Sequence, residues 1–75
     1  MAISFTTTTG STTVTVNDLF HGSSTGDFVE FESVSGLTSQ LHTDIENGGD
    51  PHVITSVTTN TYTFEVANAA DGDFS

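Results

Sequence analysis

The most regular alternation of apolar and polar residues lies near the end of the chain. Over residues 61–67, Tyr62, Phe64 and Val66 alternate with polar residues. Because successive side chains of a β-strand point to opposite faces of its sheet, this segment predicts a strand whose apolar face turns inward. Residues 58–60 predict the turn that precedes this strand.

The segment before this turn predicts the other strand of a hairpin. Residues 52–57 are rich in β-branched residues, and His52 and Ile54 share one face. Val57 lies three positions after Ile54, so the alternation is broken by one residue. This step predicts a β-bulge near residues 55–56.

A second hairpin is predicted at the beginning of the chain. Residues 3–8 and 12–16 form its two strands, with a turn at Gly10. Four apolar side chains are expected to face one layer of the core: Ile3, Phe5, Val14 and Val16. The run of threonines at residues 6–9 leaves a second interpretation open, in which this part of the chain is a low-complexity linker.

Residues 27–33 predict the clearest strand, with Val29 and Phe31 on its inward face. Phe28 falls on the outward face, which Glu30 and Glu32 share. We therefore expect Phe28 either at the end of a barrel or in contact with a neighbouring protein.

A glycine-bearing loop, residues 17–26, precedes this strand. Gly22 and Gly26 are the positions where we expect positive φ, because glycine alone adopts it at no steric cost. Asp27 is expected to accept hydrogen bonds from nearby backbone amides and so to close the turn. His21, next to Gly22, is expected to close the loop with a hydrogen bond of its own.

The connection between the hairpins is ambiguous. Leu37, Leu41 and Ile45 are spaced by four, which suits one or two helical turns but equally an irregular loop that these three residues pin. Residues 47–51 are a strong signal for a turn.

Together these patterns predict a single all-β domain over residues 1–75, a small antiparallel β-barrel or rolled sheet of five to six short strands. A chain of 75 residues without cysteine cannot be braced by a disulfide or a thiolate-bound metal. A chain this short buries about 60% of its unfolded surface, so its core is small and a partner surface is the support we favour.

Three aromatic residues are the candidate interface: Phe20, Phe28 and Phe74. Leu19 and Phe20 are too apolar for a solvated loop, so at least one of them is expected to cap the core. Phe74 lies in residues 68–75, which predict a frayed tail or a lead into a partner. The alternative, that a small core uses all three rings, stays open.

The charge balance narrows the classes of partner. The chain has ten acidic residues and no Lys or Arg, for a net charge of −10. Such a chain cannot neutralise phosphates, which excludes nucleic acid and anionic membranes as partners. An acidic body favours basic partners, divalent cations or simple repulsion between copies. The sequence shows neither an apolar run long enough for a membrane span nor a signal peptide.

Two segments carry a resemblance to a known family. Residues 21–27 contain His-Gly followed by Thr-Gly-Asp, and residues 57–64 read Val-Thr-Thr-Asn-Thr-Tyr-Thr-Phe. With the segments between them they resemble, over residues 12–66, a module recurrent in bacteriophage virion proteins. This module is often labelled after the first catalytic cysteine half-domain of ubiquitin-activating enzymes.

The resemblance implies a small antiparallel β-barrel in a head, tail or fibre component that holds other proteins. No thioester chemistry carries over, because the chain has no cysteine. The chain departs from the family pattern at His52, where an aromatic residue is usual, and over residues 37–51, which are longer and more polar than the usual link.

Candidate chemistry is sparse. His21, His42 and His52 match no metal-binding spacing. Residues 71–73 and 47–50 offer oxygen ligands for calcium, but the twelve-residue loop of an EF-hand is absent. No Gly-x-Ser-x-Gly nucleophile motif occurs. We therefore expect no enzyme and no cofactor, with calcium as the minority alternative.

The functional expectation is a non-enzymatic structural protein or domain of a virion, either a capsid decoration or a tail component. It is expected in many copies or as a homo-oligomer, bound to other virion proteins. The alternative is a carbohydrate- or receptor-binding module of a phage fibre or adhesin, which the exposed aromatic residues and the acidic surface motivate.

Overall fold

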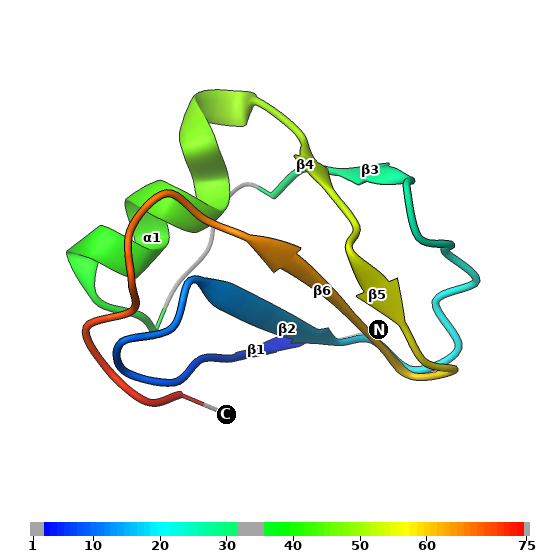
Figure 1. Cartoon of the computed structure of the whole chain (residues 1–75), viewed down its shortest axis with the longest axis horizontal. Helices are drawn as coiled ribbons and strands as arrows, with labels where there is room; N and C mark the ends of the chain where they lie inside the picture. The colour runs from blue at the N-terminus through cyan, green and yellow to red at the C-terminus, as the bar shows by residue number, and fades with distance from the viewer. Residues whose placement is uncertain (1–2, 32–35, 75) are drawn as a thin grey trace.

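The computed structural model describes residues 3–31 and 36–74 (Figure 1). Within these residues the fold is mostly β, with one α-helix, α1 (Ser39–Glu46), and a 3₁₀ turn, η1 (Asn47–Gly49). The strands are β1 (Ser4–Thr6), β2 (Thr13–Asn17), β3 (Phe28–Val29), β4 (His52–Val53), β5 (Ser56–Val57) and β6 (Thr61–Glu65). Six short strands fit the number expected from the sequence.

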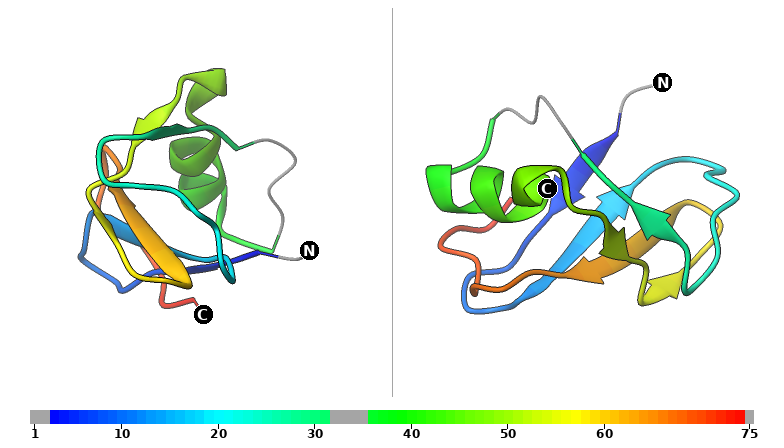
Figure 2. Two further views of the ribbon diagram at one scale, coloured as in Figure 1. Left: turned by 90° about the vertical axis from the view of Figure 1, so that its right-hand side faces the viewer. Right: turned by 90° about the horizontal axis from the view of Figure 1, so that it is seen from above.

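The strands form two antiparallel sheets. The larger sheet has the order β1-β2-β6-β5, and β3 pairs with β4 in a separate ribbon. The α1 helix and the β3–β4 ribbon lie on the same side of the larger sheet (Figure 2). Strands β1 and β5 stay at its edges, so the pairings among the described residues do not close a barrel.

The register of β2 and β6 places their apolar residues opposite one another. Val14 pairs with Phe64 and Val16 pairs with Tyr62, and all four side chains are buried. Because side chains alternate along a strand, the threonines between them face the other side of the sheet. The predicted inward face of the last strand is therefore confirmed.

Aromatic rings fill the space between the two sheets. The Phe64 ring stacks on the imidazole of His52, with 4.2 Å between ring centroids, and on Phe31 at 5.4 Å. Phe5 meets Phe31 edge-on at 5.2 Å. Val29 packs against the same cluster. The inward positions predicted for Val29 and Phe31 are confirmed.

The strand predicted over residues 52–57 is interrupted. The Ile54 N–H donates to the carbonyl of Asp27 (2.8 Å), whereas the Thr55 N–H donates to the carbonyl of Thr63 (2.8 Å). The chain thus leaves one sheet and joins the other between Ile54 and Thr55. The break in alternation marks a change of sheet, not a bulge within one strand, and the prediction of one continuous strand is wrong.

The strand predicted over residues 27–33 is also shorter than expected. Pairing is limited to β3, whose Phe28 and Val29 lie opposite Val53 and His52. Residues 30 and 31 are not in a strand, and the rest of the predicted segment, with Glu32, lies outside the described residues.

The first hairpin forms as predicted, with shorter strands. Phe5 pairs with Val16 and packs on the core, but Ile3 is 41% exposed and does not join it. The inward position expected of Ile3 is wrong, because residue 3 precedes the first paired residue of β1 and no strand covers it there.

Of the two structures that the spacing of Leu37, Leu41 and Ile45 allows, the chain adopts the helix, α1. Leu41 and Ile45 are fully buried, and Leu37 packs against the core. The Thr38 hydroxyl accepts the Leu41 N–H (3.2 Å) as an N-cap, and Asn47 ends the helix in the left-handed region.

The tail is tied to the first hairpin. Thr7 and Phe74 exchange two backbone hydrogen bonds, of 2.9 and 3.1 Å, and the Ala70 N–H donates to the carbonyl of Ser11 (2.9 Å). The Thr7 hydroxyl also donates to the carbonyl of Gly72 (2.9 Å). The prediction of fraying is wrong for residues 70–74, because the outer side of the first hairpin offers backbone partners that the local sequence does not reveal.

Candidate functional site

The loop that precedes β3 has the shape that its glycines predict. Gly22 and Gly26 adopt φ of 71° and 93°. The Asp27 carboxylate accepts the Ser24 N–H (2.9 Å), and the Gly26 N–H donates to the carbonyl of Ile54 (2.9 Å). The turn-closing role of Asp27 is therefore confirmed. The hydrogen bond from Gly26 also joins the loop to Ile54, the residue that follows β4.

His21 fastens the same loop to the β5–β6 turn. Its Nδ1 accepts the N–H of Ser23 (2.9 Å), so the ring proton sits on Nε2. Nε2 lies 2.8 Å from the carbonyl oxygens of both Thr58 and Thr61. The loop-closing role expected of His21 is confirmed, and both ring nitrogens are engaged by backbone groups.

The His21 ring also rests on the core. It meets Tyr62 edge-on, with 5.0 Å between ring centroids. Burial raises the pKa of the Tyr62 phenol above its ordinary value of 10.0, and the negative charge of Asp18 raises it further. The phenol is therefore neutral at physiological pH.

Phe20 projects from this fastened loop into solvent. Its φ is 53°, which is rare for a bulky residue, and the residue is 72% exposed. The side-chain oxygen of Asn60 accepts its N–H (3.3 Å), and the backbone carbonyl of Asn60 accepts the N–H of Asp18 (2.8 Å). Leu19 is 52% exposed, so the expectation that Leu19 or Phe20 caps the core is wrong. The hydrogen bonds of the loop hold both residues outward.

A hollow of about 320 Å³ lies beside Phe20. Its lining comes from the loop and from the β5–β6 turn: Phe20, His21, Gly22, Ser23, Thr58 and Thr59. One wall is thus an aromatic ring, and the others are glycine, hydroxyl-bearing residues and the fastened imidazole.

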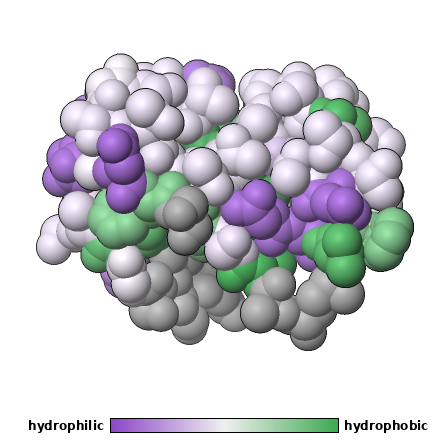
Figure 3. All heavy atoms as spheres, turned by 90° about the horizontal axis from the view of Figure 1, so that it is seen from below, coloured by the Kyte–Doolittle hydropathy of each residue, from purple (hydrophilic) through white to green (hydrophobic). Residues whose placement is uncertain are grey.

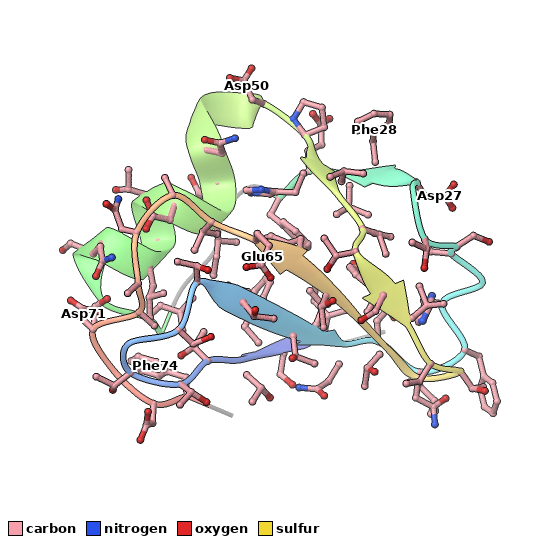
Figure 4. The ribbon with its side chains drawn as sticks, viewed as in Figure 1. Asp27, Phe28, Asp50, Glu65, Asp71 and Phe74 are labelled. Carbon is pink, nitrogen blue, oxygen red and sulfur yellow. The ribbon has the colours of Figure 1, made fainter. Side chains whose placement is uncertain are left out.

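Phe28 lies elsewhere, on the outer face of the β3–β4 ribbon. It is 72% exposed and pairs with Val53, which is 47% exposed. Figure 4 shows its ring pointing away from the core, on the side of the ribbon where Asp27 and Asp50 also lie. Apolar surface in the view of Figure 3 is divided into several separate areas.

Phe74 does not join these rings. It lies on the opposite side of the molecule, with its backbone paired to Thr7 and its ring against Gly72 (Figure 4). The structure therefore separates the three candidate interface residues into three places.

The residues considered for metal binding are not brought together. Within residues 3–31 and 36–74, no three His, Asp or Glu side chains converge as a metal site requires. Asp71 accepts the Thr38 hydroxyl (2.6 Å), Asp73 accepts the Thr9 N–H (2.6 Å), and His42 lies 2.8 Å from Glu46 on α1.

None of the helices in the described part of the chain is long and apolar enough to span a membrane.

The roles of two residues near these surfaces cannot be predicted from the sequence. Asn60 reads as an ordinary turn residue, and its bonds to the loop depend on a contact across 40 positions of the chain. Val53 reads as part of a hairpin strand, and its pairing with Phe28 follows only from the change of sheet after Ile54.

Comparison of the chain with known protein families, with curated proteins and with solved structures finds no match. The resemblance to the virion module therefore stays a prediction from the sequence.

Proposed function

We propose that this chain is a non-enzymatic structural module of a virion, which docks on other virion proteins through Phe20. The observation that carries the proposal is the conformation of Phe20. A bulky residue at positive φ costs about 1–2 kcal/mol and persists only where its surroundings hold it. Because Phe20 is 72% exposed, the strained conformation gains little packing within the described fold.

The exposed ring of Phe20, on a loop that hydrogen bonds hold in place, has the properties of an interface anchor. Burying a phenylalanine side chain fully against a partner contributes about 1.5–3 kcal/mol, and aromatic side chains are enriched at protein–protein interfaces. His21 and Asn60 hold the loop before binding, so less conformational entropy is lost when the ring is buried.

The arrangement of the sheets supports the structural part of the proposal. Both sheets pack on one core, which supports the rolled sheet that the sequence predicts. Strands β1 and β5 are edges to which a neighbouring chain can add a strand. Many copies on a capsid or a tail can be held by such pairing together with the Phe20 contact.

The test is co-sedimentation of a tagged chain with the particles made in the cells that encode it. The chain should band with the particles in a density gradient, and Phe20→Asn should lower the banded amount at least tenfold. Asn is chosen because it tolerates positive φ, so the loop keeps its shape without the ring.

The matched control is Ile3→Ser, which also removes an exposed apolar side chain but lies outside the loop. It should band like the wild type. A wild-type chain that stays at the top of the gradient contradicts the proposal, and so does a Phe20→Asn chain that bands in full amount.

A carbohydrate-binding module is the second candidate, because the hollow beside Phe20 combines an aromatic wall with hydroxyl-bearing residues. Sugars stack their apolar faces on such rings and exchange hydrogen bonds with such side chains. A glycan array probed with and without Ca²⁺ separates the two functions. Silence under both conditions removes this candidate.

A further inference from the structure

The outer face of the β3–β4 ribbon is an apolar surface that the described residues leave largely exposed. Phe28 and Val53 are cross-strand partners, so their side chains lie side by side on one face. The opposite face of the same ribbon carries Val29 and His52, which pack on the core. The inner face of the ribbon is therefore held by the core, while Phe28 is 72% exposed and Val53 is 47% exposed on the outer face.

Exposed carboxylates flank this apolar pair along both segments of the chain. Asp27 precedes Phe28 and Glu30 follows Val29, and both are exposed. Asp50 lies two residues before the first residue of β4 and is exposed as well. Figure 4 shows Phe28 between the labelled Asp27 and Asp50 along one border of the molecule. The surface thus has an apolar centre and an acidic rim.

The negative charge of this rim restricts the kind of protein surface that can bind here. A second copy of the chain brings no Lys or Arg, and both copies carry a net charge of −10. Self-association here would place like charges opposite one another around the apolar pair, which is unfavourable. The covering surface must therefore supply cations together with an apolar contact.

We propose that the outer face of the β3–β4 ribbon docks a basic protein segment, in which apolar side chains are flanked by Lys or Arg. The inference rests on the proposed function only in treating the chain as a docking module. It adds a second surface, distinct from Phe20, and the charge of its partner. Attraction between the rim and such a segment steers association and weakens as salt screens it.

The experiment follows backbone amide NMR signals of the whole chain during titration with a synthetic peptide. The probe has two adjacent Leu residues with three Lys residues on each side. One matched control replaces both Leu by Ser, and another replaces every Lys by Glu. We expect saturable shifts confined to the amides of residues 27–30, 50 and 52–54 with the first peptide. Both controls should bind at least tenfold more weakly, and 0.5 M NaCl should weaken binding several-fold.

Two variants with equally exposed rings localise the contact. Phe28→Ser should weaken binding of the Lys/Leu peptide about tenfold, whereas Phe20→Asn should leave it unchanged. Unchanged signals of the buried core residues show that each variant remains folded.

The inference is overturned by shifts spread over all acidic sites, by equal binding of the Ser control, or by no loss with Phe28→Ser. Binding at the Phe20 loop overturns it too, but leaves the proposed function standing. Failure of co-sedimentation, in contrast, counts against the proposed function and not against this surface.

Discussion

Two histidines make the same bond in two different regions of this molecule. His52 lies inside the core, and its Nε2 is 2.8 Å from the carbonyl oxygen of Ile45 at the end of α1. His21 lies at the surface, and its Nε2 is 2.8 Å from the carbonyl oxygens of Thr58 and Thr61. Each ring also contacts an aromatic neighbour, Phe64 for His52 and Tyr62 for His21.

The difference lies in what each bond holds. His52 joins the helix to the β3–β4 ribbon and stacks within the aromatic core, so its contacts contribute to the stability of the fold. His21 joins a loop to a turn, and what depends on it is the position of Phe20. The same residue type thus serves the stability of the fold in one region and the presentation of a surface in the other.

The largest expected effect comes from His52→Ala. Removing a buried ring leaves a cavity beside Phe64 and an unpaired carbonyl at Ile45, and should lower the free energy of unfolding by about 3 kcal/mol. Urea unfolding followed by tyrosine fluorescence measures it. His52→Phe keeps the stacking but not the bond, so it should cost less, about 1–2 kcal/mol. Equal losses for the two variants would show that the ring itself contributes little.

A smaller effect on stability is expected from His21→Ala. This ring is half-buried and water can replace its bonds, so the loss should be about 1 kcal/mol. The amides of Phe20 and Ser23 should nevertheless exchange with solvent much faster, because the loop loses its attachment. If His21→Ala destabilises the chain as much as His52→Ala does, the contrast between the two regions is wrong.

The smallest expected effect on stability comes from the carboxylate of Asp73, which lies at the surface. The Thr9 N–H donates to Asp73 and lowers the pKa of this carboxyl below its ordinary value of 3.8. A lowered pKa in the folded chain stabilises the fold above pH 3.8, and this contribution is lost as the pH falls through the lower value. Carbon-13 NMR titration of Asp73 should show that lower pKa in the wild type. An ordinary pKa would show that the tail is not held at Thr9.

The sequence predicts those features that depend on local periodicity. The inward faces of β2 and β6 follow from alternation, and the loop follows from Gly22, Gly26 and Asp27. Each of these signals is complete within a few residues of the chain, so no knowledge of distant contacts is required. The apolar residues spaced by four allow α1 but equally allow an irregular loop, so only the structure decides between them.

The features that were missed all depend on contacts between distant segments. The change of sheet after Ile54 depends on the hydrogen bond between Ile54 and Asp27, a residue 27 positions earlier in the chain, because the bond between Thr55 and Thr63 lies within the predicted hairpin. The tail is held by Thr7 across 65 positions of the chain. Whether Phe20 turns inward or outward is decided by Asn60 and His21, and the apolar character of the ring gives no indication of that direction.

The most direct test of the central claim is the unfolding free energy of Phe20→Asn. If Phe20 is held at positive φ for docking alone, Asn should relieve backbone strain and leave the fold as stable as the wild type, or more stable by about 0.5–1 kcal/mol. The same variant should lose its place on the particles. A clear loss of stability would contradict this account, because it would show that the exposed ring supports the fold itself.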